Sequence, residues 1–230
     1  MLTDAIAEAD GFIASLGREE REALGARLRP IRFGDGEPIV TAGEPGADLY
    51  LILEGRAEVG LVSVQGREVT YRDVGPGDMI GEIAAIDRSP RSASVTARGP
   101  VLAGVLTRAD FEALIADSPG FALAMMRHLT GQIRSVTERV FELSTMLVRD
   151  RVVREVLRRG RAAADGADRA ELSPAPTHLD LASRIGANRE AVSREMSRLS
   201  GEGLLTRAGR RLVIPSLAAL AEELDDPPEG

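Results

Sequence analysis

The hydrophobic pattern of this chain changes its period once, near Thr107. From about residue 31 to 106, short apolar runs are separated by Gly, Pro and Asp, as in LYLIL, AEVGLVSV, VTYRDV, MIGEIAAI, ASVTA and LAGVL. Runs of this length with such turn residues between them are typical of the short strands of a barrel or jelly roll. After Thr107 the period becomes helical. The sequence therefore predicts an α+β protein, with an N-terminal β jelly-roll followed by helices.

Helix start signals follow this switch in order along the chain. Thr107 and Asp110 form a predicted capping box at the start of a short helix. Ser118 and Pro119 then suit the N-cap and first position of a longer helix, which continues to about residue 147 without an internal proline. Two further helices are expected over residues 18–28 and 150–163.

The long helix carries an apolar repeat at heptad spacing. Two sets of residues recur every seven positions and are offset by four, namely Leu129, Val136 and Leu143, and Ile133, Val140 and Leu147. This is the spacing of a two-position coiled-coil seam about three heptads long. Polar residues flank the seam, which favours a parallel homodimer through the helix over 121–147. Packing of the same residues on the chain's own barrel is the alternative.

Charge is distributed unevenly along a chain whose net charge is −7. Residues 149–214 carry 14 arginines and 9 acids, whereas the segments before and after them are acidic. This contrast indicates two domains, with any nucleic-acid contact in the second. All 29 basic residues are arginine and cysteine is absent. Lysine-based catalysis, Walker-type phosphate loops, disulfides, iron–sulfur clusters and Cys-ligated zinc are therefore excluded.

Membrane insertion and export are not expected for this sequence. No apolar run approaches the ~18 residues of a membrane span. The N-terminal stretch MLTDAIAEADGF carries acids and lacks the basic start of a secretory signal. We therefore expect a cytoplasmic protein without membrane association.

Two predicted short helices are joined at Gly186, within residues 177–205. Thr177 and Asn188 are the predicted N-caps of the first and the second helix. Their inward-facing residues are expected to be Leu179, Leu181, Ala182 and Ile185 in the first, and Val192, Met196 and Leu199 in the second. Two short helices joined around a glycine, the second well supplied with arginine, are typical of a helix-turn-helix.

The second of these helices carries the candidate DNA-reading residues in its first two turns, namely Arg189, Glu190, Ser193 and Arg194. Arginine can donate twice to guanine O6 and N7, and glutamate can accept from cytosine N4. A surface ion pair between Glu190 and Arg194 is compatible with this role. The stretch LLTRAGRRLVI then predicts a hairpin wing with an Ala-Gly turn, which presents Arg207, Arg210 and Arg211 to phosphates. Thr177 and Asn188 complete the predicted DNA-binding set.

A second candidate site lies in GEIAAIDRSPRSASV, residues 81–95. Glu82 follows a glycine, and nine residues later Arg91 and Ser92 follow a proline. A planar guanidinium with a neighbouring hydroxyl suits a buried phosphate, and an ionised carboxylate can bind a ribose 2′-OH. This set fits a cyclic nucleotide. An ion pair between Glu82 and Arg91 across the loop explains the spacing equally well.

The motifs, taken in order, resemble a known family. FGDGEPI from Phe33, AGEPGADLYLILEG from Ala42, GPGD from Gly75 and GEIA…SPRSASV from Gly81 closely resemble the cyclic-nucleotide-binding domain. GANREAVSR, within the helix-turn-helix, matches the recognition helix of the same family. Residues 10–215 therefore resemble a transcription regulator of the Crp–Fnr superfamily, that of the catabolite activator protein.

The resemblance implies roles for the residues of the first site. Gly81 and Glu82 correspond to ribose contacts, and Arg91 and Ser92 to phosphate contacts, with Ile83 and Ala93 beside them. At the base-facing end lie Gln132, Val136 and Thr137. Gln132 replaces an arginine and Val136 replaces a hydroxyl residue of the family pattern. Cyclic AMP is the favoured allosteric effector and cyclic GMP the alternative.

The resemblance also implies partners and domain limits. Arg189, Glu190 and Arg194 match the family's base-reading triplet, which implies a TGTGA-like inverted repeat bound by a homodimer, with RNA polymerase as a further partner. The expected domains are a cyclic-nucleotide-binding domain over 1–117, a dimerisation helix over 118–148, a winged helix-turn-helix over 149–224 and a disordered tail over 225–230.

Other functions fit the residues less well. A jelly-roll metal enzyme needs clustered histidines and carboxylates, but His128 and His178 both lie outside the expected barrel, so neither a catalytic residue nor a metal ligand is assigned. Iron–sulfur sensing needs cysteine, and haem sensing a barrel histidine. A ligand-independent DNA binder with a vestigial pocket would not need Glu82, Arg91 and Ser92. A scaffold without DNA leaves the basic segment unexplained.

Overall fold

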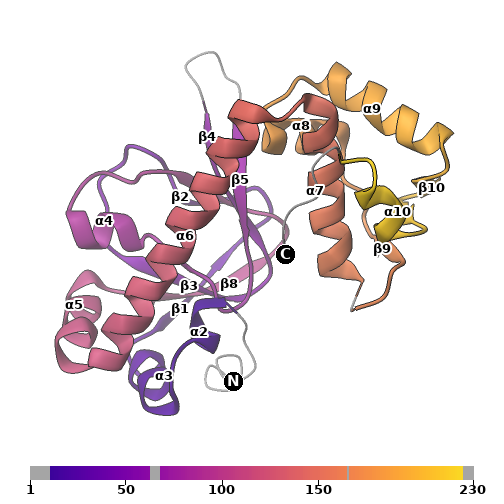
Figure 1. Ribbon diagram of the computed structural model, residues 1–230. Helices are drawn as coiled ribbons and strands as arrows, with labels where there is room; N and C mark the ends of the chain where they lie inside the picture. Colours follow the sequence, from indigo (N-terminus) through magenta and orange to yellow (C-terminus); the bar gives the residue numbers. More distant parts are fainter. Residues whose placement is uncertain (1–10, 63–67, 165, 225–230) are drawn as a thin grey trace. The chain divides into compact units, whose positions relative to one another are not determined.

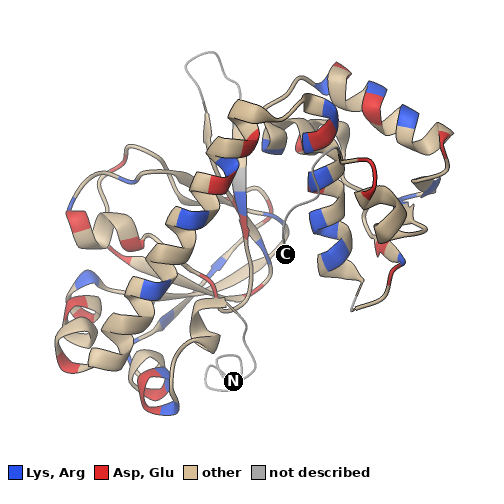
Figure 2. Cartoon of the chain, viewed as in Figure 1, with Lys and Arg blue, Asp and Glu red and all other residues tan. Residues whose placement is uncertain are grey.

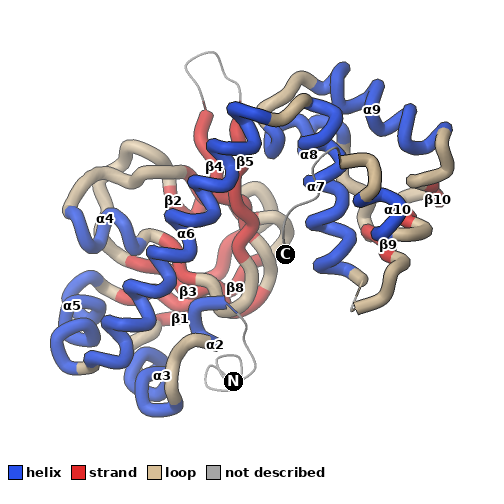
Figure 3. Tube along the Cα trace, viewed as in Figure 1, coloured by secondary structure: helices blue, strands red, loops and turns tan. Residues whose placement is uncertain are grey.

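The computed structural model describes residues 11–62, 68–164 and 166–224 (Figure 1). The chain divides into two compact units between Ser135 and Val136, inside the long helix α6 (Pro119–Thr145). The first unit is rich in strands and the second is mainly helical (Figure 3). This content confirms the predicted α+β class.

Two four-stranded antiparallel sheets build the first unit. Their strands are β1 (Arg29–Phe33), β2 (Pro38–Val40), β3 (Leu49–Glu54), β4 (Ala57–Val62), β5 (Glu68–Val74), β6 (Met79–Ile80), β7 (Ser94–Ala97) and β8 (Val101–Leu106). The first sheet has the order β1-β8-β3-β6 and the second the order β2-β7-β4-β5. Neighbours such as β1 and β8 are far apart in sequence, so each sheet forms only when distant segments meet.

Strand β3 shows why the run LYLIL is continuously apolar. Leu49, Leu51 and Leu53 are buried in a core shared with the helices of the unit, whereas Ile52 is buried in the core between the two sheets. Successive side chains of a strand point to opposite faces. A strand that is covered on both faces therefore needs apolar residues at successive positions.

The predicted helix starts in this unit are confirmed. Thr107 Oγ1 accepts a hydrogen bond from the Asp110 backbone N at 3.2 Å before α5 (Arg108–Asp117). Ser118 Oγ accepts one from the Phe121 backbone N at 3.2 Å at the start of α6. The helix expected over 18–28 is α3 (Arg18–Gly25), and the short α2 (Gly11–Ala14) precedes it.

The apolar pattern of the run MIGEIAAI suggested one continuous strand, but the run forms two different elements. Met79–Ile80 form β6, and Glu82–Asp87 form the helix α4. Gly81 separates the two elements with a φ of 88°, a left-handed conformation that glycine adopts without strain. The chain therefore turns at Gly81, and Glu82 becomes the first residue of a helix.

The second unit contains the predicted helix-turn-helix. Its elements are α7 (Val148–Ala163), β9 (Ala170–Leu172), α8 (His178–Ile185), α9 (Arg189–Gly201), β10 (Thr206–Ala208), β11 (Arg211–Ile214) and α10 (Leu217–Ala221). The three strands form one antiparallel sheet in the order β10-β11-β9. Thr177 Oγ1 accepts from the Asp180 backbone N at 3.0 Å, and Asn188 Oδ1 accepts from the Ala191 backbone N at 2.7 Å. Both predicted N-caps are thus confirmed.

The predicted inner face of α8 is wrong at one position. Leu179 is 66% exposed, whereas Leu181, Ala182 and Ile185 are buried. Residues two positions apart lie about 200° apart around a helix. Leu179 therefore points away from the core when Leu181 points into it.

The wing is a hairpin, but its turn is shifted by one residue from the Ala-Gly turn that the sequence suggested. Ala208 pairs with Arg211, so the two turn residues are Gly209 and Arg210. Gly209 has a φ of 62°, a positive value that tight two-residue hairpin turns favour at their first central residue and that glycine adopts without strain. The turn therefore places Arg210 at the tip of the hairpin.

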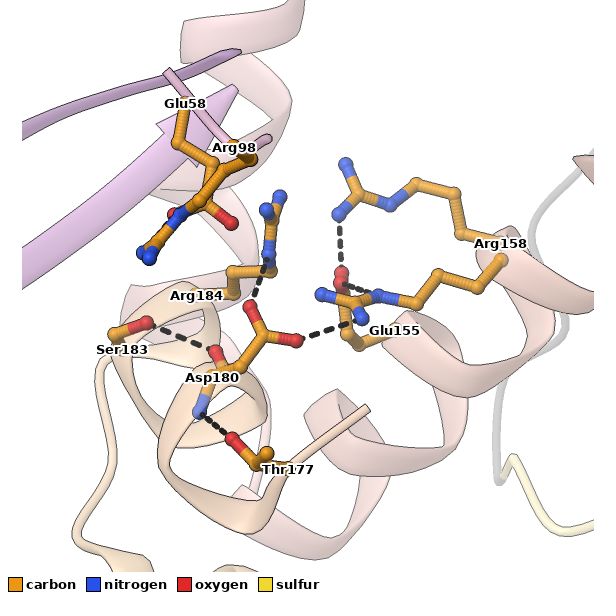
Figure 4. A network of polar contacts seen from close by, with 9 residues as sticks. Glu58, Arg98, Glu155, Arg158, Thr177, Asp180, Ser183 and Arg184 are labelled. Carbon is orange, nitrogen blue, oxygen red and sulfur yellow. Dashed lines mark hydrogen bonds and ion pairs between the residues drawn. The ribbon is translucent and has the colours of Figure 1, made fainter. Parts of the chain in front are cut away.

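A network of charged residues joins α7 to α8 within the second unit (Figure 4). Asp180 accepts a hydrogen bond from Arg184 Nε at 3.0 Å and another from Arg159 Nη1 at 2.7 Å. Glu155 pairs in turn with Arg158 and Arg159. Arg184 and Glu155 are buried. The Arg159–Asp180 pair therefore holds α8, the first helix of the helix-turn-helix, on α7, and both of its side chains are largely shielded from solvent.

These contacts set the ionisation of Asp180. Burial alone would raise the pKa of Asp180, but the hydrogen bonds and charges of Arg159 and Arg184 outweigh burial and hold the pKa below its ordinary value of 3.8. A carboxylate with a lowered folded-state pKa stabilises the fold at pH values above its unfolded-state pKa. That stability is lost as the pH falls through the folded-state pKa.

Asp180→Asn keeps the backbone N–H that donates to the capping hydroxyl of Thr177, but it removes the negative charge of the side chain. At pH 7 we expect it to lower the free energy of unfolding by about 1–3 kcal/mol, the range for lost hydrogen bonds to a charged group. The measurement is urea unfolding at several pH values. The difference from wild type should shrink as the pH falls below ~3.8, where the unfolded wild-type carboxyl also becomes protonated.

Asp117→Asn is the matched control for this prediction, because Asp117 is an exposed carboxylate at the end of α5. It should change the free energy of unfolding by less than ~0.5 kcal/mol. An Asp180→Asn variant that is as stable as wild type at pH 7 would show that the network does not hold α8.

Candidate functional site

A pocket lies in the first unit, over the second sheet and beside α4. It encloses about 440 Å³ of unfilled space, which includes the solvent at its open mouth. Its walls consist of Val40, Val59, Arg72, Ile80, Gly81, Glu82, Ile83, Ala84, Arg91, Ser92, Ala93, Val95 and Gln132. Seven residues of the predicted ligand-binding set thus surround one pocket, namely Gly81, Glu82, Ile83, Arg91, Ser92, Ala93 and Gln132.

The floor of the pocket is a cross-strand row of the second sheet. Its members come from β2, β7, β4 and β5 in turn and are Val40, Val95, Val59 and Arg72. Paired residues in neighbouring strands lie side by side on the same face. The floor is therefore apolar over three strands and ends in a guanidinium at the fourth.

Hydrogen bonds to backbone carbonyls fix the side chain of Arg91 in the pocket wall. Its side chain is 8% exposed, and Nη1 donates to the Gly81 carbonyl at 3.2 Å while Nη2 donates to the Asp48 carbonyl at 2.7 Å. A Cβ at Gly46 would lie 2.9 Å from Arg91 Nε, so glycine is needed there to admit the side chain. Backbone carbonyls orient the guanidinium but carry no net negative charge that would neutralise it.

Glu82 is held by a different partner. Its side chain is 4% exposed, and Oε1 accepts a hydrogen bond from Gln132 Nε2 at 2.8 Å. Within the described ranges no ion pair joins Glu82 to Arg91, so the alternative explanation of their spacing is wrong. The pocket thus contains a buried acid and a buried base that are positioned separately.

Gln132 links Glu82 to His128, one turn earlier on α6. Gln132 Nε2 lies 2.7 Å from His128 Nε2, and the His128 ring meets Phe12 edge to face at 5.3 Å between ring centroids. Burial, the largest effect, lowers the pKa of His128 below its ordinary value of 6.5; the charge of Glu82 opposes the shift and that of Arg72 adds to it. A neutral His128 can accept the second amide hydrogen of Gln132, which fixes the amide that donates to Glu82.

Sequence reasoning missed two residues at this pocket, although each had a signal. His128 precedes Gln132 by four residues, a spacing that places both on one helix face. Arg72 shares one face of β5 with Val74, which is buried, whereas a register irregularity separates Arg72 from Thr70. The alternation along β5 therefore points Arg72 inward, and an inward-facing arginine in a strand is unusual without a functional partner.

Val136 and Thr137, the other predicted base-facing residues, follow Gln132 by about one turn of α6. They belong to the second unit, whereas the pocket walls belong to the first. Their assignment to the ligand therefore stays a prediction.

The apolar repeat of α6 is exposed over its central part. Ile133, Val136 and Val140 each expose more than half of their surface. Met126, seven residues before Ile133, is exposed as well and extends the repeat by one heptad toward the N-terminus. Large apolar residues at heptad spacing on an open helix face are typical of a helix–helix interface.

The ends of the predicted repeat behave differently from its centre. Leu129 packs against the helix-and-sheet core of the first unit, as the alternative interpretation expected. Leu147 lies beyond the end of α6, where it is the N-cap residue of α7. The exposed repeat is therefore shifted toward Met126 compared with the predicted seam.

The candidate DNA-reading residues lie in the first two turns of α9, a helix along which residues of both charges alternate (Figure 2). Arg189, Glu190 and Arg194 are exposed and Ser193 is half-buried, whereas Val192, Met196 and Leu199 are buried in the core. In the part of the chain that the structure describes, Glu190 and Arg194 form no ion pair with each other. Both side chains are therefore available to an external partner.

The wing and the start of α8 add basic residues near this helix. Arg207 and Arg210 are exposed, and Arg211 is exposed but pairs with Glu171 at 3.0 Å. Burial, followed by the positive charges of Arg207 and Arg189, lowers the pKa of His178 below its ordinary value of 6.5. Arg189, Arg207 and Arg210 are all exposed, so the start of α9 and the wing present positive charge to solvent.

Two other classes of site are absent from the described residues. No group of three or more His, Cys, Asp and Glu side chains there could hold a metal ion. No helix in those ranges combines the length and the apolar character needed to span a membrane.

Gly81 offers a direct test of how Arg91 is positioned. A Cβ at Gly81 would lie 2.7 Å from Arg91 Nη1 and 2.9 Å from the Asp48 carbonyl oxygen, at a φ of 88°. Gly36→Ala is the control, because Gly36 also has a positive φ but no atom within 4 Å of the added Cβ. We expect the left-handed backbone to lower the free energy of unfolding of both variants by ~1–2 kcal/mol. In Gly81→Ala, overpacking against Arg91 should lower it by a further ~1–3 kcal/mol. Equal losses in urea unfolding would show that Arg91 is not held against Gly81.

Comparison with known proteins assigns a family to each unit. Residues 30–118 match the cyclic nucleotide-binding domain, and residues 150–223 match the Crp-like helix-turn-helix domain. The first match contains the pocket-wall residues from Val40 to Val95, and the second contains α8, α9 and the wing.

Relatives align with most of the chain. The CRP-like cAMP-activated global transcriptional regulator of Mycobacterium tuberculosis is 28% identical over 200 residues, which cover 86% of this chain and 89% of the relative. The Cyclic AMP receptor protein of Thermus thermophilus is 32% identical over 194 residues, which cover 84% of this chain and 86% of the relative.

Solved structures agree with this assignment. The catabolite activator protein of Thermus thermophilus is 28% identical, with 92% of this chain and 96% of that chain covered and a TM-score of 0.53. The c-di-GMP-responsive regulator CLP of Xanthomonas campestris shares the fold at 21% identity, with 87% of this chain and 100% of that chain covered and a TM-score of 0.76. Families and relatives alike are transcription regulators rather than enzymes. The chain therefore belongs to the Crp–Fnr superfamily of transcription regulators.

Proposed function

We propose that this regulator binds a cyclic nucleotide in the pocket of the first unit and, as a homodimer, an inverted-repeat DNA site through α9. The pocket carries the proposal. It presents a buried guanidinium that, among the described residues, has carbonyl but no carboxylate partners, and separately a buried carboxylate that accepts from an amide. Such a pair suits a ligand that has an anion and a hydroxyl at different places.

The phosphate of the nucleotide would bind at Arg91. Arginine presents fork donors that match phosphate oxygens. Ser92 is exposed at the pocket wall and adds a hydroxyl donor beside the guanidinium. Phosphate binding would be favourable because the phosphate supplies a negative charge next to the guanidinium of Arg91, which the neighbouring backbone carbonyls do not supply.

The ribose would bind at Glu82. Its carboxylate has acceptor capacity beyond the single hydrogen bond from Gln132, so it can also accept from the 2′-OH. Gly81 leaves the backbone open on the sugar side, and Ile83 and Ala93 line the same region. Val136 and Thr137 are proposed to approach the base from α6.

Cyclic AMP is the effector that we favour, and cyclic GMP is the alternative ligand. Support comes from the two relatives whose names state a response to cyclic AMP. Both align over more than four-fifths of this chain.

DNA recognition is proposed for Arg189, Glu190, Ser193 and Arg194 of α9, with Thr177, Asn188, Arg207 and Arg210 on the phosphates. Arginine and glutamate at these positions suit guanine and cytosine edges in the major groove. The proposed site is a TGTGA-like inverted repeat. RNA polymerase is the proposed further partner, and the protein is proposed to act in the cytoplasm.

A parallel homodimer through α6 would couple the two sites. Met126, Ile133, Val136 and Val140 would form its seam, and Gln132 on the same helix reaches the pocket. A nucleotide that binds the DNA-competent state more tightly shifts the population toward it. In that state two recognition helices would stand about one DNA turn apart, ~34 Å. The proposed domain limits stay at 1–117, 118–148 and 149–224, whereas the tail expected over 225–230 lies outside the described residues.

Arg91→Gln tests the nucleotide site. Glutamine keeps hydrogen-bond donors for the neighbouring carbonyls but carries no charge. We expect the affinity for cyclic AMP, measured by isothermal titration calorimetry, to fall at least ~30-fold, because a buried charge pair with the phosphate is lost at a cost of about 2 kcal/mol or more. Arg88→Gln is the control, since Arg88 is an exposed arginine of the same loop. Normal affinity in Arg91→Gln would refute the phosphate assignment.

Val140→Glu tests the seam. A carboxylate on each helix of a parallel dimer would be desolvated beside its copy, which is strongly unfavourable. Light scattering should report a dimer for wild type and a monomer for Val140→Glu at micromolar concentration. Ser135→Glu, an exposed polar position on another face of α6, should remain a dimer. A dimeric Val140→Glu protein would mean that α6 does not form the interface.

A further inference from the structure

Arg72 is a polar residue in an otherwise apolar row. Val40, Val95 and Val59 form the rest of the pocket floor, and Arg72 ends it on β5. Val74, two residues further along β5 on the same side of its register irregularity, is buried. The strand therefore directs Arg72 into the pocket rather than toward solvent.

The guanidinium of Arg72 is only partly satisfied by the protein. Nη2 donates to the Met79 carbonyl at 3.3 Å, a long hydrogen bond. Nε is buried and has no hydrogen-bond partner among the described residues. A buried donor without a partner costs stability, so its presence in a pocket wall points to an acceptor that the ligand supplies.

The position of Arg72 relative to Arg91 indicates which part of the ligand it meets. Arg91 precedes β7, and β4 separates β7 from β5 in the second sheet. Two strand spacings amount to roughly 10 Å. With the phosphate at Arg91, Arg72 stands at the far end of the apolar floor. A purine base laid over the three valines would turn its edge toward Arg72.

We propose that Arg72 contacts the base of the bound cyclic nucleotide and favours guanine over adenine at that contact; this inference rests on the proposed function. Arginine has only donors. Guanine presents two adjacent acceptors, O6 and N7, whereas adenine presents the N7 acceptor beside an N6 donor. A guanidinium can therefore donate twice to guanine but only once to adenine, next to a donor that it repels. Because Arg72 binds guanine more tightly than adenine, the pocket would also accept cyclic GMP as a second ligand.

The test compares wild type with Arg72→Leu by isothermal titration calorimetry of the full chain with cyclic AMP, cyclic GMP and cyclic IMP. Cyclic IMP shares O6 and N7 with cyclic GMP but lacks the 2-amino group. We expect Arg72→Leu to weaken cyclic GMP and cyclic IMP by about tenfold or more, the effect of one bidentate base contact, and to change cyclic AMP by less than about threefold. Arg56→Leu, which removes an exposed arginine of the same unit, should leave all three affinities unchanged.

Arg72→Gln provides a second variant in case leucine disturbs the fold, which circular dichroism melting would reveal. Glutamine keeps one donor arm and should give an intermediate loss for cyclic GMP and cyclic IMP. Equal weakening of all three nucleotides, or no change in any, would overturn the role of Arg72 while the proposed function stands. Loss of cyclic GMP alone, with cyclic IMP unaffected, would also overturn it, because the 2-amino group would then be what is read. Wild-type protein that binds none of the three would overturn the proposed function as well.

Discussion

The buried guanidinium of Arg91 is the group around which the pocket is built. It donates to carbonyls that precede β3 and follow β6, and its own backbone precedes β7. Three segments that are distant in sequence thus meet at one side chain, which is possible because Gly46 and Gly81 leave room for it. Since carbonyls rather than carboxylates hold the guanidinium, its charge stays available to an anionic ligand. The positive charge of the pocket therefore depends on the way in which the chain segments beside β3, β6 and β7 meet at Arg91.

Helix α6 contributes both to the pocket and to the proposed dimer seam. Gln132 reaches from α6 into the pocket and donates to Glu82, while apolar residues of the same helix are exposed at heptad spacing. Beyond α6, the ion pair between Arg159 and Asp180 joins α7 to the first helix of the helix-turn-helix. In the proposed function, a nucleotide that contacts Glu82 would therefore act on an element that also carries the proposed dimer seam. The proposed DNA-reading helix α9 belongs to the second unit, which has its own buried ion pairs.

Features set by neighbours in sequence could be predicted, and features set by distant contacts could not. The N-caps at Thr107 and Asn188 depend on residues within one turn, so their sequence signals sufficed. The helix that begins at Glu82 was missed, because its apolar run resembles a strand and only the turn at Gly81 ends β6. Leu179 was placed inside because an apolar residue in a short helix is ambiguous until its neighbours are packed. The clustering of the site residues came from the resemblance to a family, whereas the amide that holds Glu82 required the fold.

The coupling between the two sites is the central claim, and fluorescence anisotropy of a labelled TGTGA–TCACA inverted repeat tests it most directly. Nucleotide-free protein would be titrated without ligand, with cyclic AMP and with cyclic GMP, at one fixed salt concentration because phosphate contacts make affinity salt-dependent. Tighter binding with nucleotide than without it is the predicted result, since the ligand must prefer the DNA-competent state. Equal affinity in all three titrations would contradict the claim and would leave a DNA-binding protein whose pocket does not control it.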